Sequence, residues 1–322
     1  ACGLNNTDVN TRTGWYSKEV TEATTGGAYP KVDEDDPTWG GRPLTFPRIQ
    51  GADVCGTVVA TGPNAAQDLL GKRVITDNWL RDWSDPMNRH KTGYYGSEAD
   101  GGFAQHAVID HRNVGPIDSD LTDAELATFS CSYSTAEGML SRAQVGRGDR
   151  VLITGASGGV GSALIQLANR RGAETIALAS RAKHAQVATL NPAHILDRNP
   201  EDLAAALRQT TGDDTVHVVA DIAGGSYFPT LIERLDRGGR YVTSGAIAGP
   251  IVDLDLRTLY LMDLTFLGST VVEPHIFRDL IGYIERGEVR PVLAATYPLK
   301  DLRQAQQAFI DKQHTGNIVV IP

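Results

Sequence analysis

From residue 150 onward, short apolar runs alternate with longer segments whose apolar residues recur every three or four positions. The short runs, such as "VHVVADIAG", are rich in β-branched residues, as expected of strands buried on both faces. The longer segments have the period of helices. Strands are predicted at 150–155, 174–180, 216–224 and 240–246, and helices at 159–172, 182–190, 201–212 and 227–239. This alternation predicts an α/β fold with a doubly wound parallel sheet.

The first third of the chain has a different pattern. Apolar runs at 54–61, 72–76 and 101–109 predict strands. Between them, 17–50 is rich in Gly, Pro, Thr and acidic residues, and 77–102 carries several aromatic residues, so both predict surface loops. Thr122 and Glu125 form a capping-box sequence that marks the start of a helix. This change of pattern, in a chain of 322 residues, predicts two domains.

Composition narrows the classes of function. The formal net charge of −9 argues against a nucleic-acid partner. The chain contains no run of about 18 apolar residues, so no membrane span is predicted. No leader peptide is recognisable. The three cysteines, Cys2, Cys55 and Cys131, fit neither a disulfide framework nor a closely spaced metal-binding pair. We therefore expect reduced thiols and a cytoplasmic location.

The segment "VLITGASGGVGSALIQLA" at 151–168 is the strongest local signal for a ligand. It predicts a strand, a Gly-rich turn and a helix whose first N–H groups and dipole favour phosphate. Gly158 allows a pyrophosphate to approach the backbone and Gly161 allows the helix to pack on the strand, although Ala156 replaces the first Gly of the usual motif. The candidate residues are Ala156, Ser157, Gly158, Gly159, Val160 and Gly161. A tight turn without a ligand is the alternative.

The residues after the second strand of this region indicate which dinucleotide binds. A site that prefers NAD usually places Asp or Glu there, but this chain has Ala179. Ser180, Arg181 and Lys183 follow, and a hydroxyl with two cations suits a 2′-phosphate. We therefore expect NADP(H) rather than NAD(H). The alternative is that these charges form the solvated start of the next helix.

Several segments together resemble a known family. In order along the chain they include "GLNNTDVNTRTGWY", "GGFAQHAVI", "GASGGVGSALIQLA" and "HTGNIVVIP". They are similar to the medium-chain dehydrogenase/reductase superfamily, and within it to the zinc-independent quinone oxidoreductase, or zeta-crystallin-like, branch. The resemblance implies a GroES-like β-barrel catalytic domain at 1–123 and 289–322 and a Rossmann nucleotide-binding domain at 124–288. It also implies a β-region that would precede Ala1.

The resemblance allows the zinc positions of the family to be compared with this chain. Zinc alcohol dehydrogenases use a Cys where this chain has Asn5, a His where it has Ala52, and a Cys that matches Cys131. One thiolate does not hold a catalytic zinc ion, which needs three protein ligands. We therefore expect no catalytic metal. Cys131 is then read as a small buried apolar residue.

Four residues match positions that face the nicotinamide or substrate in the family. Asn5 matches an Asn typical of the quinone oxidoreductase branch, and Thr7 stands where zinc relatives carry a proton-relay hydroxyl. Tyr16 matches an aromatic hydroxyl at the substrate cleft, and Thr135 matches a Thr close to the nicotinamide. These four are the candidate catalytic residues. A local turn bond for Thr7 and Asp8 and a packing role for Tyr16 remain open.

The resemblance adds further candidate cofactor contacts. It places the segments 244–249 and 266–270 beside the nicotinamide carboxamide, and it places Asn317 where many relatives have a Lys near the pyrophosphate. The residues concerned are Gly245, Ala246, Gly268, Ser269 and Asn317. The segments 17–50 and 77–102 are longer than in quinone oxidoreductases, and we expect them to cap the substrate cleft.

Together these features predict an NADPH-dependent oxidoreductase that transfers a hydride to an activated carbonyl, enone or quinone without zinc. The alternatives are a non-catalytic NADPH-binding protein of crystallin or redox-sensor type, and a zinc alcohol dehydrogenase. The expected partner is a small-molecule substrate, with no membrane and no nucleic acid. The apolar stretch "TFLGSTVVEP" has the character of an edge strand and suggests a homodimer.

Overall fold

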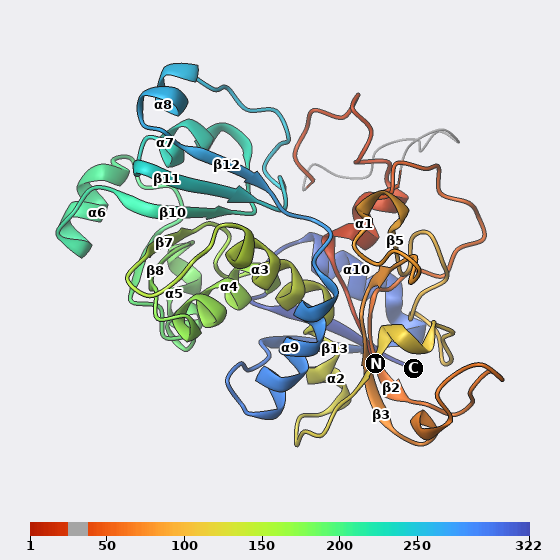
Figure 1. Ribbon diagram of the computed structural model, residues 1–322. Helices are drawn as coiled ribbons and strands as arrows, with labels where there is room; N and C mark the ends of the chain where they lie inside the picture. Colours follow the sequence, from red (N-terminus) through yellow and green to blue (C-terminus); the bar gives the residue numbers. More distant parts are fainter. Residues whose placement is uncertain (25–37) are drawn as a thin grey trace. The chain divides into compact units, whose positions relative to one another are not determined.

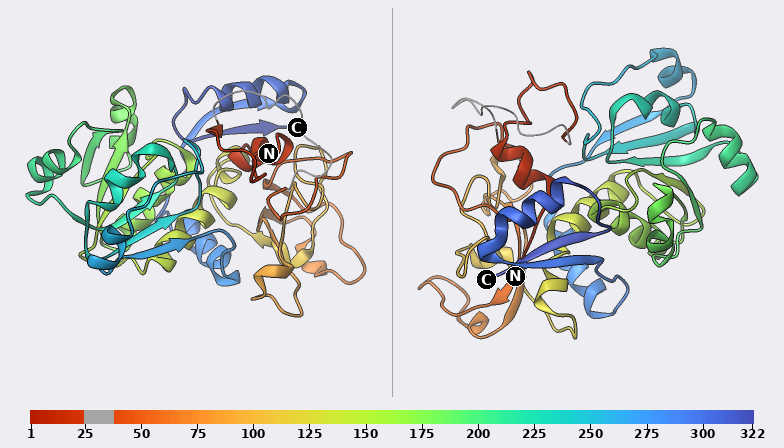
Figure 2. Two further views of the ribbon diagram at one scale, coloured as in Figure 1. Left: turned by 90° about the horizontal axis from the view of Figure 1, so that it is seen from above. Right: turned by 180° about the vertical axis from the view of Figure 1, so that it is seen from behind.

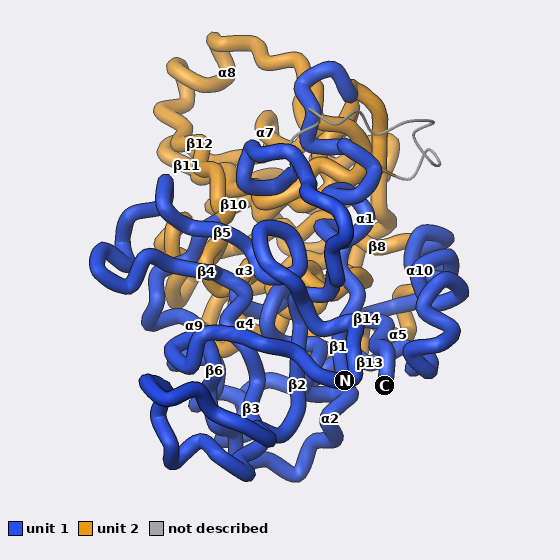
Figure 3. Tube along the Cα trace, turned by 90° about the vertical axis from the view of Figure 1, so that its right-hand side faces the viewer, with its two compact units in different colours: residues 1–20, 27–134, 271–322 blue, residues 21–26, 135–270 orange. Residues whose placement is uncertain are grey.

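A computed structural model describes residues 1–24 and 38–322, so part of the predicted loop 17–50 lies outside the described residues. The chain forms two compact units (Figure 3). Unit 1 contains residues 1–20, 38–134 and 271–322, and unit 2 contains residues 21–24 and 135–270.

Unit 2 is built on a six-stranded sheet, which is parallel as predicted. The strands are β7 (Arg150–Ile153), β8 (Glu174–Ala179), β9 (His194–Asp197), β10 (Val216–Asp221), β11 (Leu235–Thr243) and β12 (Thr265–Gly268). Their order across the sheet is β12-β11-β10-β7-β8-β9, and every neighbouring pair is parallel (Figure 1). The connecting helices are α4 (Gly159–Arg170), α5 (His184–Ala188), α6 (Leu203–Thr211), α7 (Phe228–Ile232) and α8 (Leu256–Leu261).

Helices α6 and α7 pack on the sheet of unit 2 through a shared apolar core. Leu203 and Leu207 of α6 and Leu231 of α7 share one buried apolar cluster with side chains of β7, β8, β10 and β11. Leu164 of α4 is fully buried but does not belong to that cluster.

The strand order changes direction between β7 and β10, and ligands of such sheets bind beyond the carboxyl ends of the strands at this point.

Unit 1 contains a second six-stranded sheet in the order β13-β14-β1-β2-β3-β6. Its strands are β1 (Cys2–Gly3), β2 (Asp53–Thr57), β3 (Arg73–Thr76), β6 (Val114–Pro116), β13 (Leu293–Pro298) and β14 (Asn317–Ile321). All neighbours are antiparallel except β13 and β14. Because β1 pairs with β14, the two ends of the described chain lie side by side (Figures 1 and 2).

Helices and a short hairpin complete unit 1. The helices are α1 (Asn6–Arg12), α2 (Asp123–Leu126), α9 (Pro274–Glu285) and α10 (Leu302–Ile310), and the hairpin pairs β4 (Trp79–Leu80) with β5 (Gly93–Tyr94). The predicted capping box is present at α2, where Thr122 and Glu125 bond to each other's backbone N–H groups. A further helix, α3 (Ser130–Arg142), contains the boundary between the units.

The strand predicted at 101–109 is wrong. No strand is present there, because the N–H groups of residues 101–103 donate to carbonyls of residues 49–51 instead. Beyond this contact the segment is exposed, and Val108 is 90% exposed. The strand predicted at 54–61 is also shorter than expected, since β2 ends at Thr57.

The helix predicted at 227–239 ends early. Helix α7 stops at Ile232, and β11 begins at Leu235, which pairs with Val216 of β10. Gly238 has a φ of +76°, a conformation that suits a bend and interrupts a helix. The parallel pairing therefore overrides the local helical pattern. Among the described residues, none of the helices is both long and apolar enough to cross a membrane.

Candidate active site

Asn5 stands at the junction between β1 and α1. Its extended backbone (φ −132°, ψ 160°) ends the strand, and it is the N-cap residue of α1. The N–H of Asn5 donates to Oδ2 of Asp8 at 2.8 Å, and the N–H of Gly51 donates to Oδ1 of Asp8 at 3.3 Å. The buried Asp8 carboxylate therefore fixes the backbone of the predicted catalytic residue.

The side chain of Asn5 is held by a second buried carboxylate, that of Asp53. Nδ2 of Asn5 donates to Oδ2 of Asp53 at 3.0 Å. Oδ1 of Asp53 accepts from Nδ2 of Asn78 at 2.9 Å and from the N–H of Cys131 at 2.7 Å. Asp53 is only 1% exposed, and Cys131 lies in the first turn of α3, where the helix dipole favours a negative charge.

Burial raises the pKa of both carboxyl groups. The pKa of Asp8 rises to about 7, and that of Asp53 rises to about 6. Hydrogen bonds from neighbouring groups lower both pKa values without offsetting the loss of solvent. The negative charge of Asp53 raises the pKa of Asp8 further. Both groups therefore titrate near neutral pH, which is unusual for aspartate.

Thr7 and Tyr16 lie together, as a shared role would require. The hydroxyl of Tyr16 donates to Oγ1 of Thr7 at 3.2 Å. Burial raises the pKa of Tyr16 to about 12, so its hydroxyl stays protonated. Thr135 lies on α3, one turn after Cys131, and belongs to unit 2.

An aromatic cluster adjoins the Asp53 network. The rings of Trp39, Trp79 and Tyr94 lie with centroids 4.9 to 5.8 Å apart. The hydroxyl of Tyr94 accepts from Nδ2 of Asn78 at 3.2 Å and also bonds to the thiol side chain of Cys131. Sequence reasoning predicted neither this cluster nor the roles of Asp53 and Asn78, whereas a local bond of Asp8 to the backbone, left open by the sequence, is present to Asn5. The only signal was that Asp53 follows Ala52, a position where the family has a metal ligand.

The Gly-rich turn of unit 2 has the geometry of a phosphate-binding loop. Gly158 is the N-cap of α4. A Cβ on Gly161 would lie 2.2 Å from the carbonyl oxygen of Gly155, so only glycine allows this close packing. A Cβ on Gly158 would meet only one atom, at 3.5 Å, so that side of the loop is open for a ligand. Ala156 and Ser157 lie between β7 and α4, and Gly159 and Val160 are the first two residues of α4.

The residues predicted to hold a 2′-phosphate follow β8, but they have protein partners. Arg181 forms an ion pair of 2.6 Å with Asp197, the last residue of β9. Burial and the nearby charge of Arg198 lower the pKa of Lys183. Ser180 is half-buried at the start of this turn. A phosphate here would therefore meet three cations and one carboxylate, and sequence reasoning missed Arg198 and Asp197.

The other predicted contacts in unit 2 lie at the same edge of the sheet. Gly245 and Ala246 follow β11, Gly268 ends β12, and Ser269 follows it. The hydroxyl of Ser269 is buried and has no hydrogen-bond partner among the described residues. A buried hydroxyl without a partner is destabilising unless a ligand supplies one, so this edge fits a dinucleotide.

Asn317 is located in unit 1. Its Oδ1 accepts from the hydroxyl of Ser132 at 3.2 Å, and its Nδ2 donates to the carbonyl of Thr128 at 3.5 Å. Its side chain therefore links β14 to the start of α3.

The residues at the zinc positions do not fit a catalytic zinc ion. Ala52 has no donor atom, and the amide nitrogen of Asn5 is bonded to Asp53. Within residues 1–24 and 38–322, no three His, Cys, Asp or Glu side chains gather as a metal would require.

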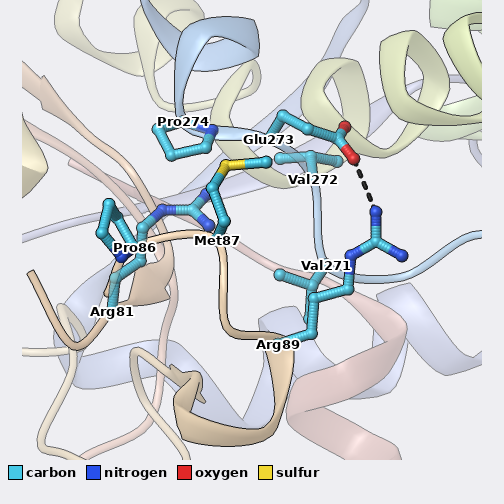
Figure 4. Close-up of a pocket in the computed structure, with 8 residues that line it drawn as sticks. All are labelled: Arg81, Pro86, Met87, Arg89, Val271, Val272, Glu273 and Pro274. Carbon is cyan, nitrogen blue, oxygen red and sulfur yellow. Dashed lines mark hydrogen bonds and ion pairs between the residues drawn. The ribbon is translucent and has the colours of Figure 1, made fainter.

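A small hollow in unit 1 lies apart from these residues (Figure 4). It is lined by Arg81, Pro86, Met87, Arg89, Val271, Val272, Glu273 and Pro274. Glu273 pairs with Arg89 at 2.7 Å, and the buried guanidinium of Arg81 lies 3.6 Å from Asp77. None of the predicted site residues lines this hollow.

Comparison with known proteins identifies the family. Residues 1–119 match the model of the alcohol dehydrogenase GroES-like domain, and residues 159–286 match the zinc-binding dehydrogenase model. A solved structure of a candidate alcohol dehydrogenase from Sinorhizobium meliloti 1021 is 41% identical, with a TM-score of 0.89. The match covers 100% of this chain and 86% of that one. The chain belongs to the medium-chain dehydrogenase/reductase superfamily.

Two further relatives of this superfamily bear on the chemistry. Quinone oxidoreductase of Mus musculus is 24% identical over 100% of this chain and 87% of its own length. The solved structure of the 2-octenoyl-CoA carboxylase reductase CINF, in complex with NADP and 2-octenoyl-CoA, is 26% identical with a TM-score of 0.79. That match covers 85% of this chain and 68% of the other. The fold is therefore an α/β Rossmann unit with a GroES-like domain, and the chain is an oxidoreductase.

Proposed function

We propose that the protein is an NADPH-dependent reductase that transfers a hydride to an activated carbonyl, enone or quinone without catalytic zinc. The observation that carries this proposal is the amide of Asn5. It replaces a zinc thiolate of the family, and its nitrogen is bonded to Asp53. This arrangement provides a neutral hydrogen-bond donor in place of a Lewis acid.

The cofactor assignment rests on unit 2. The open side of the turn at Gly158 suits a pyrophosphate, and the unpartnered hydroxyl of Ser269 suits a polar group of the nicotinamide half. Arg181, Lys183 and Arg198 supply positive charge for a 2′-phosphate. NADPH supplies the hydride when it is bound. The NADP in the related CINF structure supports this choice over NAD.

The residues of unit 1 would act on the substrate oxygen. Negative charge reaches this oxygen when a hydride adds to a conjugated system, and donors placed around it stabilise the charge. We assign this role to the amide of Asn5 and to the hydroxyl pair of Thr7 and Tyr16, whose high pKa keeps the phenol protonated. Thr135 is assigned to orientation of the nicotinamide. The proton that completes the reduction comes from water.

The substrate class follows from what the relatives share. The names of the quinone oxidoreductase and of the 2-octenoyl-CoA carboxylase reductase indicate different molecules, but quinones and enoyl thioesters both contain a double bond conjugated to a carbonyl. Such substrates accept a hydride at carbon without a metal on oxygen. We therefore propose a conjugated carbonyl compound as the substrate.

Domain roles and assembly complete the proposal. Residues 1–123 and 289–322 would form the catalytic domain, and 124–288 the cofactor domain. A homodimer is proposed because β12 is an edge strand and α8, which precedes it, carries exposed apolar side chains. We also propose a cytoplasmic location, because Cys2, Cys55 and Cys131 form no disulfide.

The test is oxidation of NADPH in the presence of a panel of quinones, enones and enoyl-CoA thioesters. The proposal predicts turnover with at least one of these classes and a preference for NADPH over NADH. Tight NADPH binding without turnover across the whole panel would instead support a non-catalytic NADPH-binding protein.

A further inference from the structure

We propose that Asp53 is a positioning residue, which holds the amide of Asn5 in one orientation so that an N–H of Asn5 faces the substrate oxygen. The inference rests on the proposed function, because it assigns a task to Asn5. Asp53 itself touches neither substrate nor cofactor in this account.

The hydrogen-bond chemistry fixes the orientation of the amide. An ionised carboxylate only accepts hydrogen bonds, so the atom of Asn5 that lies 3.0 Å from Oδ2 of Asp53 must be the nitrogen. A primary amide nitrogen carries two hydrogens, and this bond uses one of them. The second N–H stays available as a donor. Without Asp53 the amide could rotate by half a turn and present its oxygen, which would repel the charge that develops on the substrate.

Asp53 is itself held rigidly, which a positioning residue requires. Its other oxygen accepts from Asn78 at 2.9 Å and from the N–H of Cys131 at 2.7 Å. These donors come from the segment after β3 and from the first turn of α3, so Asp53 connects three parts of unit 1. Since it is 1% exposed, water does not compete for these bonds.

The arrangement requires an ionised Asp53. A protonated carboxyl group would place a hydrogen on one of its oxygens, and that hydrogen would face one of the three donors. The titratable groups that face Asp53 are Asp8 from α1, Cys2 from β1, Tyr94 from β5 and Cys131 from α3. The raised pKa values of Cys2 and Tyr94 keep both neutral, which leaves Asp8 as the neighbouring group that titrates near neutral pH.

A double-mutant cycle tests the catalytic part of the inference. Asp53→Asn keeps the size of the side chain but replaces one acceptor oxygen with a donor. It should lower kcat by about tenfold or more and leave the Kd for NADPH unchanged. In an Asn5→Ala background the same substitution should have no further effect on kcat. An equal fold-loss in both backgrounds would show that Asp53 does not act through Asn5 and would overturn the inference.

Asp77→Asn is the matched control. Asp77 is another buried aspartate of unit 1 whose pKa is raised to about 6, but its partner is Arg81 rather than Asn5. This variant should lower thermal stability and leave kcat unchanged. A loss of kcat equal to that of Asp53→Asn would assign the effect to general destabilisation and would contradict the inference.

A second readout does not depend on turnover. The side-chain amide resonance of Asn5, assigned by its absence in Asn5→Ala, should shift as the pH passes through the pKa of Asp53, and Asp53→Asn should abolish this shift. Asp8→Asn should retain it. An unchanged titration in Asp53→Asn would overturn the inference. A wild-type protein without turnover would contradict the proposed function alone, since this resonance still reports whether Asp53 holds the amide.

Discussion

Two carboxylates hold Asn5 at its two ends, Asp8 at the backbone N–H and Asp53 at the side chain. Both are buried, and both have a raised pKa. Placing two ionisable groups so close together without solvent lowers stability, and proteins retain such clusters mainly at functional sites. The arrangement therefore supports a functional role for Asn5 in addition to capping a helix of seven residues.

The titration of Asp8 should be visible in protein stability. Its pKa rises from 3.8 to about 7 in the folded chain, so the native state binds this proton more tightly than the unfolded state. The stability that the proton contributes is present below the unfolded pKa and is lost as the pH rises towards about 7. Asp8→Asn removes this dependence. Chemical denaturation from about pH 5 to about pH 8 should show the wild type losing free energy of unfolding relative to Asp8→Asn. A constant difference across this range would contradict the raised pKa.

The Arg181–Asp197 pair should influence cofactor affinity. Asp197 places a negative charge beside the proposed 2′-phosphate site and forms an ion pair with the guanidinium of Arg181. Asp197→Asn should therefore tighten NADPH binding by about two- to fivefold, the size expected for one exposed charge pair, and leave NADH binding unchanged. Fluorescence titration measures both. Asp213→Asn, which breaks a pair with Arg150 elsewhere in unit 2, is the control and should change neither affinity. Equal tightening for NADH would contradict a 2′-phosphate site.

At the scale of elements, periodicity predicted unit 2 better than unit 1. Its central strands, such as β7 and β10, are largely buried, and their apolar runs are unambiguous. The pattern failed where tertiary pairing decides the structure. Residues 101–103 bond to residues 49–51 rather than continuing a strand, and Leu235 joins β11 although its neighbours are helical in pattern. Strands β9 and β13 and helices α8 and α9 are among the elements that were not predicted.

In the candidate site, too, sequence predicted the features that are local along the chain and missed the long-range contacts. Gly158 and Gly161 were predictable because the turn motif is local in sequence. The partners of Asn5 and Arg181 were not, since Asp53 and Asp197 lie on other strands and reach them only after the sheets form. A buried carboxylate with amide partners has no sequence signature of its own.

The two glycines of the turn should respond differently to alanine. Gly161→Ala would push a methyl group against the carbonyl of Gly155, so the helix must move and thermal stability should fall. Gly158→Ala fits the fold but extends into the open side of the loop, so it should weaken NADPH binding by about tenfold or more with little change in stability. Calorimetry and NADPH titration distinguish the two. Unchanged affinity in Gly158→Ala would place the cofactor elsewhere.

In the whole molecule, the proposed homodimer would form between the β12 edges of unit 2 in two chains. Among the described residues, strand β12 has a single neighbour in the sheet, and Leu256 and Tyr260 of α8 are 64% and 62% exposed. Leu256→Asp should reduce the mass in sedimentation velocity from twice 34.6 kDa to the monomer value. Leu70→Asp, at an exposed apolar residue of unit 1, should not. A wild-type protein that sediments as a monomer would contradict the dimer.

In the proposed site an amide, rather than a metal, stabilises the charge on the substrate oxygen. The most direct measurement is NADPH oxidation by protein exhaustively treated with a chelator, with bound zinc quantified in the same sample. We predict full turnover of a conjugated carbonyl substrate with far less than one zinc per chain, because Ala52 and Asn5 supply no strong ligand. Turnover that is lost with the metal and restored by stoichiometric zinc would contradict the account.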